Sequence, residues 1–157
     1  MKKPRYQPAM KHIGIALALL VLAACASAPP DPTRPQIDIA EVMGLGDQSY
    51  VRGPFDVQYE LSIANPAAEP ITLRRVELAT TGGGGAYSLR RDPYVFKQVI
   101  APGTRAAVRF WAHAYANYFP GDPGTTAPVS IRGIATFDSP KGGLQQVFFK
   151  VLSQFPE

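Results

Sequence analysis

The chain has 157 residues, with 16 lysines and arginines against 12 aspartates and glutamates, which gives a formal net charge of +4. Four of the basic residues and none of the acidic ones lie before residue 26, so the rest of the chain is formally neutral. The basic balance therefore does not favour nucleic acid or an acidic surface as a partner. The single cysteine excludes disulfide bonds within the chain and metal sites built from several thiolates.

Residues 1–24 have the features of an export signal. A segment with four basic and no acidic residues precedes an apolar run from Ile13 to Ala24 (IGIALALLVLAA). This run is shorter than the roughly 20 apolar residues that a helix needs to cross a hydrocarbon core. We therefore predict that residues 1–24 are a signal peptide and not a membrane-spanning anchor.

The signal ends at Leu22-Ala23-Ala24-Cys25, which resembles the lipobox of bacterial lipoproteins. In that family a peptidase cuts before the cysteine, which carries diacylglycerol on its thiol and usually a further acyl chain such as palmitate on its amine. The resemblance implies lipidation of Cys25, and two or three acyl chains anchor a protein more firmly than one. Ala26 and Ser27 follow without an aspartate, which implies sorting to the periplasmic face of the outer membrane. The alternative is an ordinary secretory signal with a chance cysteine near the cut.

After the signal, the chain divides into a tether and one domain. Residues 25–35 hold the lipidated cysteine and a proline-rich stretch (ASAPPDPTRP), which we expect to be extended and semi-rigid. Residues 36–157 show no internal repeat or second change in composition. They are long enough to bury a core without disulfide bonds and are interpreted as one domain.

Apolar and polar residues alternate with a period of two in this domain. Phe55 to Ile63 alternates without a fault, which predicts a half-buried antiparallel strand that ends at Asn65-Pro66. The core residues predicted from this strand are Tyr59, Leu61 and Ile63. A further strand over residues 71–78 changes phase at Arg74-Arg75, which predicts a β-bulge there.

The rest of the domain continues this pattern. Further strands are predicted over residues 86–91, 94–100, 105–116, 128–137 and 144–153, between glycine- and proline-containing turns at 82–85, 102–103, 120–124 and 139–143. No segment has a convincing helical period. The sequence therefore predicts an all-β fold, an antiparallel β-sandwich of about seven or eight strands of the immunoglobulin-like or fibronectin-III-like kind.

One order of motifs is similar to the late-embryogenesis-abundant type 2 domain of the water-stress and hypersensitive-response class. A strand, Asn65-Pro66, Glu69-Pro70-Ile71-Thr72-Leu73 and a second strand follow one another, and Ile100-Ala101-Pro102-Gly103 precedes a long strand. The resemblance covers residues 37–137 through short motifs. It implies a non-catalytic domain for stress protection or envelope interactions, and it brings no set of functional residues.

The sequence contains no catalytic or metal-binding constellation. His113 is the only histidine after residue 25, and no HxH, HExxH or GxSxG element is present. Gly82 to Gly85 precedes a strand and no Gly-Lys-Ser/Thr, so we interpret it as a strand connection and not a phosphate loop. We predict no enzyme activity, no metal and no cofactor. Glycosidase chemistry with paired carboxylates stays open as an alternative, because scattered acidic residues can meet in the fold.

The strand over residues 105–116 offers the best candidate for a ligand site. One face is apolar and suited to the core, with Ala106, Val108, Phe110, Ala112 and Ala114. On the other face, cations alternate with aromatic rings at Arg109, Trp111, His113 and Tyr115. Such a face can bind sugars, aromatic ligands or peptides by stacking. The opposite interpretation is that a neighbouring strand or loop covers this face.

We therefore expect a lipid-anchored envelope protein with a structural, stress-protective or binding role. One alternative is a glycan-binding or glycan-active module, and another is an accessory subunit of a larger envelope complex, joined by strand addition. The expected partners are the membrane, through the lipid on Cys25, and an envelope glycan or protein, but no nucleic acid. Clustered carboxylates in a cleft would favour a glycan-active enzyme, and an exposed aromatic stripe would favour a glycan-binding module. An exposed apolar patch would favour a subunit of a complex.

Overall fold

The computed structural model describes residues 31–44, 54–82, 85–118, 123 and 127–153, and these residues contain eight strands and no α-helix. The predicted signal peptide over 1–24 and Cys25 lie outside the described residues. All the strands belong to the unit Pro32–Glu157. They are β1 (Gln36–Met43), β2 (Pro54–Ala64), β3 (Ile71–Thr80), β4 (Tyr87–Leu89), β5 (Pro93–Ile100), β6 (Arg105–Ala116), β7 (Val129–Ser139) and β8 (Gly142–Leu152).

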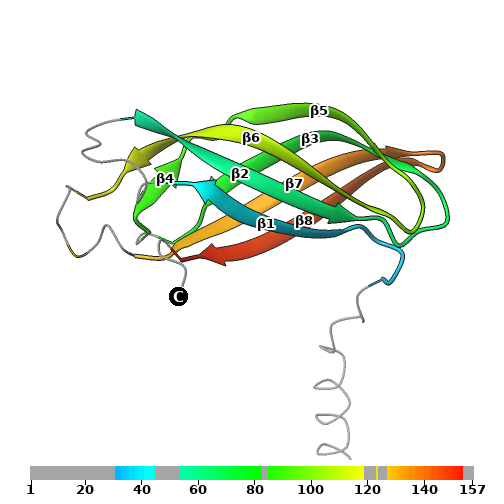
Figure 1. The fold of residues 1–157 in the computed structure, drawn as a ribbon, viewed down its shortest axis with the longest axis horizontal. Helices are drawn as coiled ribbons and strands as arrows, with labels where there is room; N and C mark the ends of the chain where they lie inside the picture. The colour runs from blue at the N-terminus through cyan, green and yellow to red at the C-terminus, as the bar shows by residue number, and fades with distance from the viewer. Residues whose placement is uncertain (1–30, 45–53, 83–84, 119–122, 124–126, 154–157) are drawn as a thin grey trace, which may run out of the picture. The chain divides into compact units, whose positions relative to one another are not determined.

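The strands form two four-stranded antiparallel sheets, and the ribbons of β2 and β7 cross in Figure 1. Sheet A has the order β1-β2-β6-β4, and sheet B has the order β5-β3-β7-β8. This is the division of strands seen in constant-type immunoglobulin domains, with β5 added at the edge of the second sheet. The predicted antiparallel β-sandwich is confirmed.

β2 shows how the sequence specifies the core. Side chains on a strand point alternately to its two faces, and every apolar residue from Phe55 to Ile63 is buried between the sheets. Tyr59, Leu61 and Ile63 are fully buried, as predicted from the alternation. β2 pairs with β1 on one side and with β6 on the other, so it lies in the interior of sheet A.

β3 contains the predicted bulge. Its pairing with β7 shifts between Leu73 and Arg75, which lie opposite the consecutive residues Phe137 and Thr136, so Arg74 is the extra residue relative to β7. Opposite β5 the same two residues pair with Gln98 and Val95, so on that side the extra residue belongs to β5. Arg74 and Arg75 are both exposed, whereas Leu73 and Val76 on either side are fully buried. The bulge therefore returns the apolar residues to the inner face after the change of phase.

Most predicted strands have bounds close to those observed, with two differences. β4 covers only Tyr87–Leu89, because the chain turns at Arg90, whose carbonyl accepts a hydrogen bond from Asp92 N (3.0 Å), and then enters the other sheet. β1 was not predicted as a separate strand, although it pairs with β2 along most of its length. The hairpin predicted at 139–143 is present, with Gly142 at a φ of 118°.

A chain of hydrogen bonds crosses the inside of sheet A. The Tyr59 and Tyr87 hydroxyls lie 2.6 Å apart, and the Tyr87 hydroxyl donates to Glu41 Oε2. Tyr59 therefore donates to Tyr87, and this chain of hydrogen bonds connects β1, β2 and β4. Burial is the main cause that raises the pKa of both phenols. Both phenols therefore keep their protons at neutral pH, and the hydrogen bonds persist.

Asn65 connects two turns at one end of the sandwich. Its side chain is buried, and Nδ2 donates to the carbonyls of Glu69 (2.8 Å), Ile100 (3.1 Å) and Ala101 (3.3 Å). Its backbone N–H donates to Thr104 O at 2.9 Å. The Asn-Pro motif after β2 therefore has a structural role, since it ties the β2–β3 turn to the β5–β6 turn.

Replacing Leu61 with alanine should lower the free energy of unfolding by about 2–5 kcal/mol, because it leaves a cavity in a fully buried site. Urea unfolding followed by circular dichroism measures the loss. Val151→Ala is the matched control, since Val151 is 63% exposed and its truncation should cost less than about 0.5 kcal/mol. Equal losses in the two variants would contradict the assignment of Leu61 to the core.

Candidate functional site

The four residues predicted as a ligand site lie in one column on the outer face of sheet A. Arg109, Trp111, His113 and Tyr115 are all exposed on β6, and we call them the aromatic face. The residues between them point inward, and Phe110, Ala112 and Ala114 are buried. β6 is held in this orientation by its register with β2, which runs from Pro54↔Tyr115 to Ala64↔Arg105.

Both basic members of the aromatic face contact carboxylates on β2. Arg109 Nε lies 2.7 Å from Glu60 Oε2, and His113 Nδ1 shares a hydrogen bond with Asp56 Oδ1. Each pair joins residues directly opposite in the β2–β6 register, where cross-strand partners are closest. The side chains of Arg109, His113 and Asp56 are more than half exposed, whereas that of Glu60 is 31% exposed.

The rings of Trp111 and Tyr115 are both 47% exposed. Trp111 lies opposite Gln58 of β2, and Gln58 lies opposite Met43 of β1, which is 42% exposed. A strand that covered this face would bury the tryptophan. The structure instead leaves the face open, with Trp111 between the Arg109–Glu60 ion pair and the His113–Asp56 hydrogen bond.

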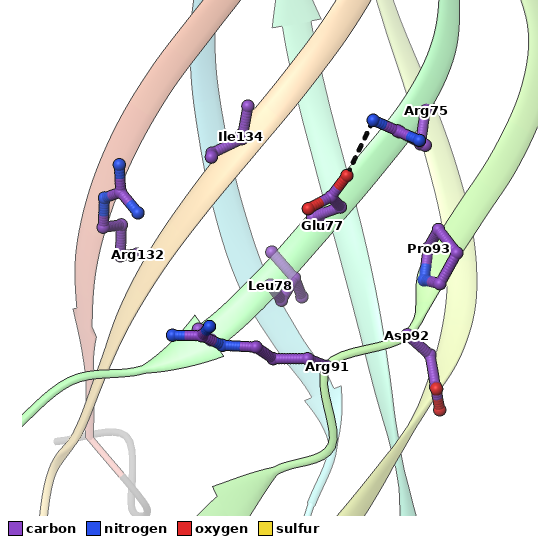
Figure 2. A pocket seen from close by; sticks show the side chains of 9 residues that line it. Arg75, Glu77, Leu78, Arg91, Asp92, Pro93, Arg132 and Ile134 are labelled. Carbon is purple, nitrogen blue, oxygen red and sulfur yellow. Dashed lines mark ion pairs between the residues drawn. The ribbon is translucent and has the colours of Figure 1, made fainter.

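A second candidate site lies on the outer face of sheet B and was not predicted. It is a hollow of about 290 Å³ beside β3, shown in Figure 2. Its basic residues are Arg75 of β3, Arg91 from the β4–β5 connection and Arg132 of β7. The spacing of these arginines along the chain gives no sign that they line one hollow.

Sheet B also exposes a row of apolar side chains on its edge strand β8. Val147, Phe149 and Val151 point outward, and Phe149 is 69% exposed. Within the register of β7 and β8, Arg132 is the direct neighbour of Phe149, so the row adjoins the hollow. We call these three residues the β8 row.

The described residues contain no cluster of metal ligands and no helix that could cross a membrane. No group of three or more histidine, cysteine, aspartate or glutamate side chains in this part of the chain could hold a metal ion. In the same residues, no helix is long and apolar enough to cross a membrane.

No family model matches the chain, and no curated protein matches it. Among solved structures, the Northeast Structural Genomics Consortium target SoR45 is similar, with a TM-score of 0.49, 11% identity, and coverage of 78% of this chain and 89% of that chain. A protein from Archaeoglobus fulgidus has a TM-score of 0.48 and 8% identity, with coverage of 78% and 96%. A Bordetella pertussis protein that bears the name ApaA has a TM-score of 0.43 and 12% identity, with coverage of 81% and 100%. At this level of likeness, none of these structures assigns a function to the chain.

Proposed function

We propose that this chain is a lipid-anchored protein of a bacterial cell envelope whose non-catalytic β-sandwich binds glycan on the aromatic face. The observation that carries this proposal is the open position of Trp111, the only tryptophan of the chain, on the outside of a sheet. A half-exposed tryptophan offers a large rigid ring for stacking and an indole N–H for a hydrogen bond, which suits it to a binding surface.

The dimensions of the face suit an extended chain of sugars. Trp111 and Tyr115 are four residues apart on one strand, which separates their backbone positions by roughly 13 Å. Two rings at this separation can contact two sugar units of a linear polymer, but they cannot enclose one small molecule. Arg109 and Glu60 beside Trp111 offer a donor and an acceptor for hydroxyl groups.

The proposed location depends on the N-terminal sequence. The apolar run and the Leu22–Cys25 lipobox support export and lipidation, and Ala26 and Ser27 support the outer membrane. A protein held there faces the envelope glycans of the periplasm. Anchoring also lowers the affinity that each site needs, because the tether holds the domain close to its ligand.

Trp111→Ala should weaken glycan binding by about tenfold to thirtyfold, since a central tryptophan can contribute about 2 kcal/mol to an interface. The probe is a soluble peptidoglycan tetrasaccharide, titrated by isothermal calorimetry and, for the parent, by tryptophan fluorescence. Every fluorescence change reports on this face, because no other tryptophan is present.

The matched control is Phe149→Ala, which removes a more exposed ring from the opposite sheet and should leave glycan affinity unchanged. Both variants should keep the stability of the parent to within about 1 kcal/mol. If Trp111→Ala binds the tetrasaccharide as well as the parent does, the proposal is wrong.

The β8 row favours a second candidate function, that of an accessory subunit in an envelope complex. Exposed apolar side chains on neighbouring positions mark many protein–protein contacts. Strand addition at this edge is disfavoured, because Lys150 of β8 forms an ion pair with Asp38 of β1 (2.8 Å) across the gap between the sheets. A partner would therefore cover the face that holds Phe149 and not extend the sheet.

A further inference from the structure

The hollow on sheet B exists because two strands part there. β5 pairs with β3 only as far as Glu77↔Pro93, whereas β3 continues along β7 to Thr80↔Ile131. The last residues of β3 therefore have no neighbour on the β5 side. The connection that brings the chain from sheet A into β5 passes this gap and supplies Arg91 and Asp92 to its rim.

The rim of the hollow is mainly basic. Arg75 is paired with Glu77 (2.9 Å), and Asp92 is paired with Arg90 (3.3 Å), so both acidic residues of the rim have a cation of their own. No ion pair to Arg91 or Arg132 occurs within the described part of the chain. Two guanidinium groups are thus available to an anion.

Figure 2 shows how these groups lie. The Arg91 side chain extends across β3 toward the strand that carries Arg132, and the Asp92 carboxylate points away from the three arginines. The arginines come from three separate segments and surround one space. A guanidinium presents paired N–H donors, which match the two oxygens of a carboxylate.

Part of the lining of the hollow is apolar. Leu78, Pro93 and Ile134 contribute to it, and Phe149 lies next to Arg132 in the register. A fully hydrated inorganic ion would gain nothing from this surface. An anion with an apolar substituent could bury that substituent there while its charged group contacts the arginines.

We propose that this hollow is a binding site for a small organic carboxylate with an apolar substituent. Its volume of about 290 Å³ is close to the lower end of the range of about 300–1,000 Å³ that is typical of small-molecule sites. Arg91 and Arg132 bind the carboxylate, and Ile134 and Pro93 contact the apolar part. The site lies on the sheet opposite the aromatic face and does not depend on glycan binding there.

The test uses the full chain in a non-ionic detergent, with N-acetylphenylalanine as the probe and N-acetylphenylalanine amide as its neutral counterpart. Saturation-transfer NMR should detect the carboxylate and show at least about tenfold weaker binding of the amide. Arg91→Gln and Arg132→Gln should each weaken binding of the carboxylate by about tenfold. Arg105→Gln, an exposed arginine on β6, should leave it unchanged.

A tripeptide, Gly-Gly-Phe with a free C-terminus, distinguishes two sources of the same chemistry. Tighter binding of the tripeptide than of N-acetylphenylalanine assigns the site to peptide C-termini, and equal or weaker binding assigns it to free organic acids. Equal binding of the carboxylate and its amide to the parent would overturn the proposal without any variant. If Arg91→Gln and Arg132→Gln have the circular dichroism spectrum of the parent and still bind the carboxylate as well as the parent does, the proposal is also overturned.

Discussion

Replacing Asn65 with alanine should lower the free energy of unfolding by about 3 kcal/mol. The substitution removes the amide that donates to the carbonyls of Glu69, Ile100 and Ala101, and the acceptor of the Ala67 N–H at 3.2 Å. Buried polar groups that lose their partners cost about 1–3 kcal/mol each, and only some of them can reach water after the change. Urea unfolding followed by Trp111 fluorescence and by circular dichroism measures the loss.

Asn117→Ala is the matched control for this prediction. Asn117 also bonds through both side-chain atoms, accepting from Ser88 Oγ (2.8 Å) and donating to Gly85 O (2.7 Å), but it is exposed. Water can replace both of its contacts, so the variant should lose less than about 1 kcal/mol. A loss below about 0.5 kcal/mol in Asn65→Ala would mean that the two turns hold their positions without the asparagine.

Replacing Cys25 with serine should release the protein from the membrane. We propose that the cysteine carries two or three acyl chains, each of which contributes about 0.8 kcal/mol per buried methylene. Without the thiol no diacylglycerol is attached. Detergent phase partitioning should therefore move the variant from the detergent phase to the aqueous phase in a single step.

Ser27→Ala, two residues after the proposed cut, is the control and should stay in the detergent phase. Mass spectrometry of the purified parent gives an independent readout, because lipid adds mass to the N-terminal peptide that begins at Cys25. Persistence of Cys25→Ser in the detergent phase would refute the anchor, as would an N-terminal peptide without lipid.

Local alternation was sufficient to predict the strands that have one buried face. Phe55 to Ile63 and Arg105 to Ala116 alternate over nearly their full lengths, and their inner and outer faces are as predicted. The β3 bulge was also predictable, because an unbroken alternation would point one of the two consecutive arginines into the apolar core. In β1, only Ile37 and Ile39 are apolar residues that point inward before the bulge near Met43. This pattern is too short to predict a strand.

The hollow could not be predicted from the sequence, because its lining residues come from separate segments that only the pairing of strands brings into one place. Arg75 and Arg132 line the same hollow because β3 pairs with β7, and no local pattern specifies that pairing. Arg91 joins them because β4 ends early and the chain changes sheets. The aromatic face, in contrast, lies on one strand, so its members could be found from their spacing. The contacts of Arg109 with Glu60 and of His113 with Asp56 could not be predicted, because they depend on the β2–β6 register.

The bulge in β3 lets its pairing with β7 accommodate the loss of one residue. Arg74 is an extra residue on the outer surface, and the partners of Leu73 and Arg75 on β7, Phe137 and Thr136, are themselves consecutive. Deleting Arg74 would therefore leave a regular ladder with β7, in which Val76 and Leu78 still face inward. On the other side it would bring Leu73 and Arg75 together opposite Gln98 and Val95 of β5, which are three residues apart, so the edge strand would have to bulge further. The deletion would also remove the ion pair with Asp138, but it would leave the core composition unchanged. The edge strand β5, and not the core, would absorb the change in length.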